Sequence, residues 1–409
     1  MEFFRAKWVL PVGRPPIENG WISTENGRVL AVGAGRAEWP GVDLGDVAVL
    51  PAFVNAHTHL ELSWMAGKVP PAASMPAWVG ALLGTRATAP TAADVGRAVS
   101  DAVATAVRGG TALFGDITNT LAAIPALEAQ GVDALVFREL IGFAVPDPMK
   151  LVGDAWLSLD AAERSREFVP RPGSRSELSY SVVAHAPYSV APALFGAIAA
   201  GKRGTPVSVH AGESPEELEF LQTGRGPFRE LLDRVGVWNP SWTPPQCGPI
   251  EYFERLGYLS PGMLAVHGTH LSDADLARLR DAGGVLVTCP RSNVWVGGGA
   301  PDAARFYRSG VRVAIGTDSL ASAPSLQMLD EMAALRRVAP GVPASRLIES
   351  ATRIGAESLG YGADFGTLET GKRAVFAAVS IPGTVTDVEE YLVSGDVDAA
   401  ADVRLVRAD

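Results

Sequence analysis

Residues 205–213 read TPVSVHAGE, residues 263–270 read MLAVHGTH, and residues 311–318 read VRVAIGTD. Each run is apolar, follows a Gly or Pro turn signal and ends in polar residues, which is typical of a buried strand. Five further runs have the same form: VLPAFVNAHTH (49–59), GTALFGDIT (110–118), DALVFREL (133–140), LSYSVVAHAP (178–187) and GVLVTCP (284–290). Eight such strands, each followed by a helix, predict an α/β chain folded as a (β/α)8 TIM barrel.

Helix-like segments separate the predicted strands. The clearest are TAADVGRAVSDAVATAVRGG (91–110), SDADLARLRDAGG (272–284), which begins with Ser272 as a predicted N-cap, and SLQMLDEMAALRRV (325–338). The two ends of the chain instead contain short β-like runs between Gly, Asn and Asp turns. We therefore expect a small composite β-sandwich domain built from residues 1–50 and 364–409, and a catalytic barrel domain over residues 51–363.

Two connections between predicted strands are long. Residues 60–90 include Trp64 and Trp78, and residues 222–262 also contain aromatic residues, Pro and Gly. Long structured insertions at the active face of a barrel usually shape a substrate pocket. We expect both connections to supply apolar contacts there.

Composition excludes several classes of protein. The chain has 409 residues, with 35 basic and 45 acidic residues, and its formal net charge of −10 argues against a general nucleic-acid-binding protein. No apolar stretch approaches the roughly 20 residues that span a bilayer, and the N-terminal residues lack a signal-peptide pattern. Cys247 and Cys289 are too few for a disulfide framework and fit a reducing compartment. We expect a cytoplasmic protein with a small-molecule partner and leave its oligomeric state open.

The histidines indicate a metal site. Five of the six end predicted strands, and the sixth, His270, follows His267 by three residues; the five are His57, His59, His185, His210 and His267. Carboxyl ends of barrel strands meet on one face. His57 and His59 point the same way at strand spacing, His210 adds a third nitrogen, and Asp318 adds a carboxylate oxygen. This set predicts a catalytic site for one divalent transition metal, zinc or alternatively iron(II).

Other polar residues at these strand ends suit proton transfer. Glu213 lies three residues after His210 and can act as a proton shuttle if burial keeps it protonated. The alternative is that it is an acidic residue before the next helix that interacts favourably with the helix dipole. His267 is placed to orient a water molecule. For Asp318, the alternative to a metal ligand is a helix N-cap. For His270, the alternative to a site residue is a cap of the turn before Ser272.

Several motifs resemble those of the amidohydrolase superfamily. In chain order they are NAHTHLEL (55–62), VHAGE (209–213), LAVHGTHL (264–271), IGTDS (315–319) and, near the end, GTLETGKRA (366–374). The predicted strand 178–187 lacks the lysine of binuclear members, so the resemblance implies the mononuclear aminohydrolase branch. HAPYSV (185–190) and CPRSN (289–293) look like its chlorohydrolase-like group. HTHLELS (57–63), GPF (226–228) and the segment from Arg138 look most similar to aminodeoxyfutalosine deaminases.

The resemblance implies hydrolytic deamination of an aromatic C–NH2 group with release of ammonia. Asp318 would take a proton from water, His267 would orient the water, and Glu213 would protonate a ring nitrogen. The implied substrate is 6-amino-6-deoxyfutalosine, an intermediate of menaquinone biosynthesis. Alternatives are adenosine, S-adenosylhomocysteine or methylthioadenosine, guanine, cytosine, or a chlorohydrolase substrate. A catalytically silent metal-binding scaffold is a remote alternative.

Substrate-binding residues are expected around this centre. Glu61, Glu139 and His185 are the polar candidates, with support of a metal histidine as the alternative role of Glu61. A futalosine-type substrate carries a benzoate, which Arg225 or Arg291 would meet in a bidentate pair. The alternative for each arginine is a solvated surface charge. Ser319 follows Asp318 where adenosine deaminases have a second Asp, which counts against adenosine.

Overall fold

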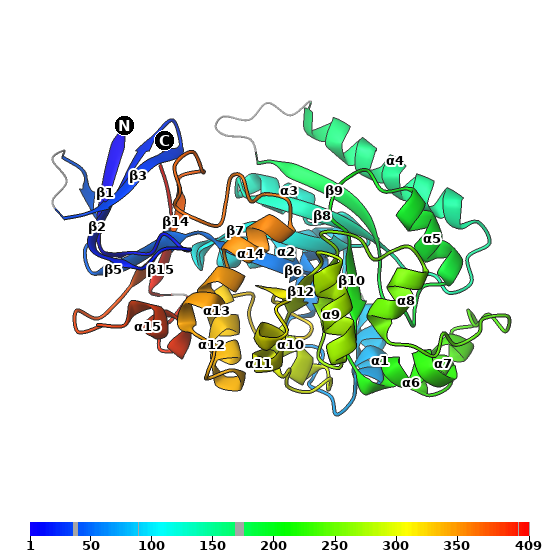
Figure 1. Ribbon diagram of the computed structural model, residues 1–409. Coiled ribbons are helices and arrows are strands. Elements are labelled where there is room, and N and C mark those ends of the chain that lie inside the picture. The colour runs from blue at the N-terminus through cyan, green and yellow to red at the C-terminus, as the bar shows by residue number, and fades with distance from the viewer. Residues whose placement is uncertain (36–39, 89, 168–175, 400, 409) are drawn as a thin grey trace.

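The structure is a computed structural model, and it describes residues 1–35, 40–88, 90–167, 176–399 and 401–408 (Figure 1). Its described strands form two four-stranded parallel sheets and one seven-stranded sheet, so the chain is a mixed α/β protein. All eight strands predicted for the middle of the chain are present. They are β6 (Phe53–Thr58), β7 (Thr111–Thr118), β8 (Asp133–Leu140) and β9 (Leu178–Ala184) in one parallel sheet, and β10 (Ser208–Ala211), β11 (Leu264–His267), β12 (Val285–Thr288) and β13 (Arg312–Ile315) in the other.

The two parallel sheets meet along two seams. At the first seam, Thr58 of β6 bridges Asp318, and the N–H groups of Thr317 and Asp318 donate to the His57 carbonyl at 3.0 and 3.1 Å. Gly316 permits this approach, because a Cβ there would lie 2.7 Å from the same carbonyl oxygen. At the second seam, the His210 N–H donates to the His185 carbonyl at 2.9 Å. Neither seam carries a continuous ladder among the described strands.

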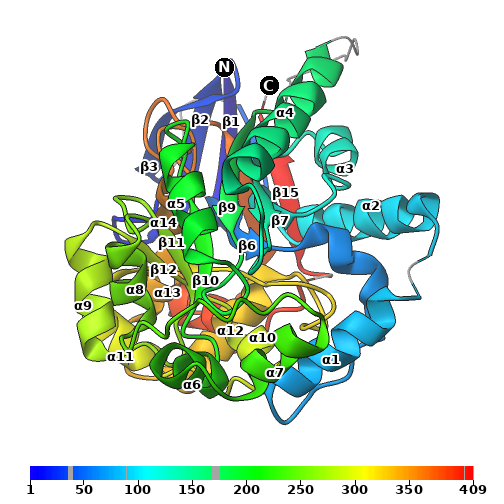
Figure 2. The same cartoon turned by 90° about the vertical axis from the view of Figure 1, so that its right-hand side faces the viewer.

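Helices surround the parallel strands, as Figure 2 shows for α2, α4, α5, α8 and α9. Because the strands are covered on both sides, their sequences are nearly continuous apolar runs. The three predicted helices are present as α2 (Ala92–Arg108), α9 (Asp273–Asp281) and α12 (Met328–Val338). The Ser272 N-cap is confirmed: its hydroxyl accepts the Asp275 N–H at 3.1 Å in a capping box.

Other helices are α3 (Ile124–Ala129), α4 (Pro148–Glu167), α5 (Pro192–Ala200), α10 (Pro290–Trp295), α11 (Ala303–Arg308), α13 (Ala344–Ser350), α14 (Arg353–Ser358) and α15 (Val388–Ser394).

The two ends of the chain form one sheet together, at the left of Figure 1. Its order is β15-β14-β5-β1-β2-β3, with β4 paired to β1, and it has its own buried cluster that includes Phe4 and Phe376. The expected joining of both ends is present, whereas the second sheet of a sandwich is not among the described strands. The strands are β1 (Glu2–Val9), β2 (Ile17–Glu25), β3 (Arg28–Ala34), β4 (Val42–Asp43), β5 (Val47–Pro51), β14 (Val375–Ser380) and β15 (Val403–Arg407).

The two long connections are structured and lie at the end of the molecule where the parallel strands terminate. The first contains the 3-10 helix η1 (Leu60–Met65) and α1 (Met75–Arg86). After β10 come α6 (Pro215–Thr223), α7 (Pro227–Arg234) and α8 (Pro249–Arg255). In Figure 1, α1, α6 and α7 lie at the bottom. Among the described residues, no helix is both long and apolar enough to cross a membrane.

Candidate active site

The first seam brings two predicted metal ligands of β6 next to Asp318. The Asp318 Oδ1 lies 3.9 Å from His57 Nε2 and 3.6 Å from His59 Nε2. Thr58, between the histidines, donates its hydroxyl to the Asp318 carbonyl at 2.8 Å. Asp318 has a φ of 60°, a left-handed conformation that costs a non-glycine residue energy and is often found at functional sites. The pairing of β6 with the end of β13 therefore fixes three side chains around one point.

His210 and His267 approach His57 from β10 and β11. The rings of His57 and His210 have centroids 5.1 Å apart, and those of His210 and His267 are stacked at 5.4 Å. Two groups of potential ligand atoms, each spanning no more than 4.8 Å, share His57: one with His59 and Asp318, the other with His210 and His267. The four residues predicted as ligands are thus brought together, with His267 beside them.

The chemistry of these atoms fits a metal. Both ring nitrogens of His57, and Nε2 of His267, are buried and have no hydrogen-bond partner among the described residues. Burial is the largest cause that lowers the pKa of His57 and His210 well below the usual value, so both imidazoles are neutral and have a lone pair to donate. Burial opposes ionisation of Asp318, but nearby histidines, His59 first, lower its pKa to about 2. Neutral imidazoles beside an ionised carboxylate are suitable ligands for a divalent transition metal.

Hydrogen bonds from behind hold these groups in place. The second carboxylate oxygen of Asp318, Oδ2, accepts the hydroxyls of Ser292 at 2.5 Å and Ser322 at 3.0 Å. His267 Nδ1 lies 2.7 Å from Asn293 Oδ1, so it carries the proton and leaves Nε2 facing the cavity. Both of these supporting residues, Ser292 and Asn293, belong to the segment CPRSN (289–293). In the structure Ser292 and Asn293 are buried and do not line the cavity, and they support Asp318 and His267.

Glu213 is buried beside His267, with Oε1 at 3.4 Å from His267 Nε2. Burial is the main cause that raises the pKa of Glu213 well above the usual value, and the charge of Asp318 adds to it. Glu217, in the first turn of α6, accepts the N–H groups of Gly212 and Glu213 at 2.8 and 3.1 Å. Glu217 therefore holds the turn, while the Glu213 carboxyl, whose pKa burial raises, lines the cavity.

These groups lie in a cavity of about 540 Å³. Eight of the predicted site residues line it together: His59, Glu61, Glu139, His185, His210, Glu213, His267 and Asp318. Its other walls are mostly apolar and come from α1, from residues 141–145 and from α7 and the segment after it. Trp78 lines the cavity and Trp64 does not, although both belong to one buried cluster with Met65 and Val69.

The polar residues predicted for substrate binding already have partners. The Glu61 carboxylate accepts hydrogen bonds from Thr118, from the Asn119 N–H at 2.9 Å and from Thr120. Burial raises the pKa of Glu139 to about 7, and its Oε1 lies 3.8 Å from His210 Nδ1.

His185 and His270 make different connections. Burial lowers the pKa of His185 to about 4, and its Nδ1 lies 2.6 Å from the Ser189 hydroxyl. His270 does not line the cavity, because its Nε2 binds the Gly298 carbonyl at 2.7 Å.

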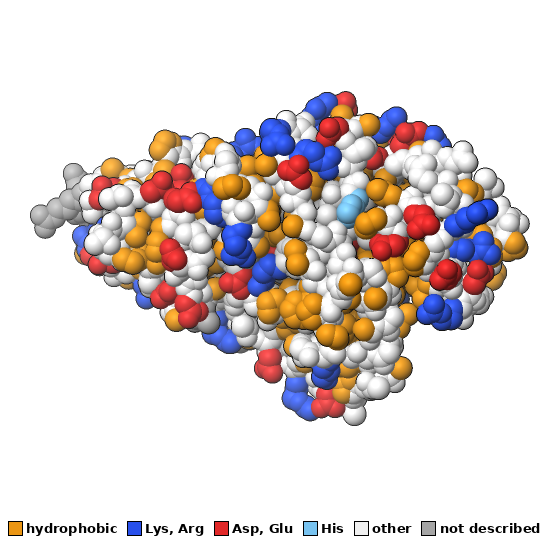
Figure 3. Space-filling model, turned by 90° about the horizontal axis from the view of Figure 1, so that it is seen from below, with side chains coloured by type: hydrophobic (Ala, Val, Ile, Leu, Met, Phe, Trp, Pro, Cys, Tyr) orange, Lys and Arg blue, Asp and Glu red, His pale blue; other side chains and the backbone are white. Residues whose placement is uncertain are grey.

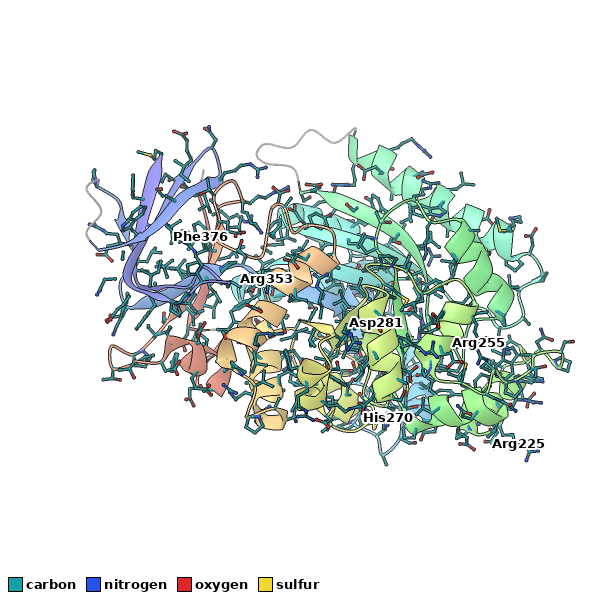
Figure 4. The ribbon with its side chains drawn as sticks, viewed as in Figure 1. Arg225, Arg255, His270, Asp281, Arg353 and Phe376 are labelled. Atoms are coloured by element: carbon teal, nitrogen blue, oxygen red, sulfur yellow. The ribbon has the colours of Figure 1, made fainter. Side chains whose placement is uncertain are left out.

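The two arginines predicted to meet a substrate carboxylate lie outside the cavity lining. Arg225 is exposed after α6, and Figure 4 shows it at the lower right edge of the molecule, pointing outward. Arg291 binds Glu331 at 2.7 Å and Asp330 at 3.0 Å on α12. Local sequence shows that an arginine is present but not which way it points. The arginine that does line the cavity is Arg86, and the prediction that residues 60–90 shape a pocket was the signal that could have found it.

Comparisons with known proteins agree with this geometry. The model of the Amidohydrolase family matches residues 48–400. The aminodeoxyfutalosine deaminase of Deinococcus radiodurans is 30% identical over 330 residues, which cover 76% of this chain and 73% of that protein. A 5-methylthioadenosine/S-adenosylhomocysteine deaminase of Desulforudis audaxviator is 29% identical over 389 residues, covering 90% of this chain and 83% of that protein.

Two solved structures have a similar fold. The aminofutalosine deaminase of Helicobacter pylori, in complex with methylthio-coformycin, matches over 100% of both chains with a TM-score of 0.84 at 23% identity. The atrazine chlorohydrolase of Arthrobacter aurescens, complexed with zinc, matches over 100% of this chain and 97% of that chain, with a TM-score of 0.79 at 19% identity. At such identities these two matches describe the fold alone.

Proposed function

The chain belongs to the amidohydrolase family, and from this premise we propose that it deaminates a 6-aminopurine nucleoside in a metal-dependent hydrolysis. As a deaminase of this family it is a hydrolase that acts on C–N bonds. The observation that carries the proposal is the convergence of His57, His59, His210 and Asp318 at one end of a cavity that also holds the protonated Glu213.

We propose that these four residues hold one divalent transition metal, with zinc as the first choice and iron(II) as the alternative. When bound, such an ion is a Lewis acid that lowers the pKa of a water molecule. The orphaned ring nitrogens of His57 support this ligand set. A zinc complex among the structural neighbours favours zinc.

The remaining residues handle protons and orientation. Asp318 is ionised, so its carboxylate can accept a proton from water. Glu213 is protonated and can donate to a ring nitrogen of the substrate, which makes the adjacent carbon more electrophilic. His267, fixed through Nδ1 by Asn293, can donate or accept at Nε2 to orient the water.

We propose 6-amino-6-deoxyfutalosine as the natural substrate, and menaquinone biosynthesis as its pathway. The relative from Deinococcus supports this choice. A cavity of about 540 Å³ with mostly apolar walls is large enough for a nucleoside with an aromatic 5′ substituent. The second candidate is a thioether nucleoside such as methylthioadenosine, because the same apolar walls suit a thioether and another relative carries that name. Adenosine would leave most of these walls without contact.

We also propose that the two parallel sheets are the halves of one (β/α)8 barrel over residues 51–363. The backbone hydrogen bonds at both seams and the high TM-scores of the family structures support it. Residues 1–50 and 364–409 would form the second, composite domain, and we keep the cytoplasm as the proposed compartment.

An ammonia-release screen tests the function. Purified metal-loaded protein would be offered 6-amino-6-deoxyfutalosine, methylthioadenosine, S-adenosylhomocysteine, adenosine, guanine and cytosine under the same conditions. We expect the futalosine compound to have the highest kcat/KM. Equal or faster turnover of another compound would contradict the substrate assignment, and no release from any of them would favour the silent metal-binding scaffold.

A further inference from the structure

The mouth of the cavity is unusually apolar for a surface. Leu83 of α1, Ile141 after β8 and Val235 after α7 line the cavity, and they are 42%, 51% and 53% exposed. They come from three separate segments and are among the few large hydrophobic side chains exposed in the described part of the chain. Figure 3 views the molecule from below, and hydrophobic side chains gather near the middle of this face. An apolar rim of this kind is typical of a binding site for an apolar group.

A single positive charge stands at this rim. Arg86, the last residue of α1, is the only Lys or Arg among the cavity-lining residues. Its side chain is exposed, and it makes no hydrogen bond or ion pair with the residues that the structure describes. Arg86 shares the cavity lining with Glu139 and His185, so its charge lies within reach of the interior of the cavity. Arg86 is therefore free to bind an anion.

The acidic residues of the cavity already have partners inside it. The Glu61 carboxylate is saturated by hydrogen bonds from residues 118–120, and Glu139 binds the side chain of Asn119 at 3.2 Å. Glu213 and Asp318 surround the histidine cluster. A zwitterionic amino-acid tail, such as that of S-adenosylhomocysteine, would find a cation at the rim, whereas the acidic residue near that cation, Glu139, is already hydrogen-bonded to Asn119. The rim thus favours a tail that is apolar and ends in an anion alone.

We propose that Arg86 is a specificity-determining residue that binds the terminal carboxylate of an apolar 5′ substituent, while Leu83, Ile141 and Val235 contact the apolar part. The inference rests on the proposed nucleoside deaminase function and deepens it: the preferred substrates are aminopurine nucleosides with an aromatic carboxylate tail. A guanidinium suits this role because its planar fork binds both carboxylate oxygens.

The test compares 6-amino-6-deoxyfutalosine with its methyl ester, which removes the negative charge and keeps the ring. The measured quantity is the preference, the ratio of kcat/KM for the acid to kcat/KM for the ester. We expect Arg86→Met to lower this ratio by roughly ten- to fiftyfold, mainly through the KM of the acid. Arg86→Lys should keep part of the preference, because it retains the charge and loses the fork. The matched control is Arg225→Met, an exposed arginine outside the cavity, which should leave the ratio unchanged.

The outcomes separate the inference from the function. If the acid-to-ester ratio of Arg86→Met equals that of the parent protein, whether or not activity on both compounds falls, the inference is wrong. The deaminase function would still stand. An equal fall of the ratio in Arg225→Met would also overturn it, because the effect would then be one of net charge. If the parent protein releases no ammonia from any aminopurine nucleoside, the proposed function fails and the inference falls with it.

Discussion

Glu213 is the residue whose chemistry depends most on its surroundings. Its carboxyl group would be ionised in water at neutral pH, but burial keeps it protonated. We expect Glu213→Gln to retain metal and to lose roughly a hundredfold or more in kcat, the usual effect of removing a positioned general acid. Metal analysis together with steady-state kinetics would measure both quantities.

The control for this variant is His210→Ala, which should instead weaken metal retention, because it removes a predicted ligand. Normal turnover by Glu213→Gln would remove the residue from the mechanism. Loss of metal from Glu213→Gln would show that Glu213 is part of the ligand shell.

Arg291 stabilises the fold rather than lining the cavity. It pairs with the fully buried Glu331, whose pKa burial raises to about 7 against the opposing effect of Arg291. Arg291→Met should lower the free energy of unfolding by about 3–5 kcal/mol, because removing one partner leaves a buried carboxyl without compensation. Its effect on the acid-to-ester preference should be small, since Arg291 does not line the cavity.

The stability loss in Arg291→Met should depend on pH. A carboxyl whose pKa is raised in the folded chain stabilises the fold fully below its unfolded pKa, and this contribution is lost as pH rises through the folded pKa. Without Arg291 the pKa of Glu331 in the folded chain rises further. The free energy of unfolding of the variant therefore continues to fall above pH 7, whereas that of the parent protein has levelled off there. Denaturant unfolding at about pH 6 and about pH 8 should therefore show the larger difference at the higher pH. A difference of the opposite sign would contradict this account.

At the scale of elements, α9 depends on its first turn. The Ser272 hydroxyl accepts the Asp275 N–H, and the Asp275 carboxylate accepts the N–H groups of Ser272 and of Ile250 in α8. Ser272→Ala should lower the free energy of unfolding by about 1 kcal/mol, the usual value of an N-cap. Ser272→Thr should restore most of the loss, because threonine keeps the hydroxyl acceptor. Unfolding curves of both variants would check this, and equal losses would show that the hydroxyl is not the cause.

At the scale of the whole molecule, the metal should hold the two parallel sheets together. The predicted ligands come from β6, from β10 and from the segment after β13, which belong to different sheets. We expect close to one metal equivalent per chain, and a clear fall in Tm when a chelator removes it, because buried nitrogens would then lack a partner. Re-addition of zinc should restore the Tm. Two tightly bound equivalents would contradict the single-metal assignment.

The strands, and the clustering of the proposed ligands, were predictable from local sequence. Buried parallel strands require apolar runs, so all eight could be found by composition and length alone. His57, His59, His210 and Asp318 could be assigned because each lies at or just after the end of a strand, and such ends converge on one face. The Ser272 cap was predictable for the same reason, since a capping box needs only four neighbouring residues.

Contacts between distant segments were decided only by the tertiary structure. Arg86 and Arg225 lie in the two long connections, and Arg291 directly follows the predicted strand 284–290. Their directions depend on helix ends and on partners far along the chain: Arg291 binds Glu331, Arg225 faces outward, and Arg86 reaches the cavity rim. In the same way, Ser292 and Asn293 of α10 bind Asp318 and His267, which come from other segments of the chain. Local patterns determine what a strand or helix can be, whereas long charged side chains are oriented by the packing of the whole chain.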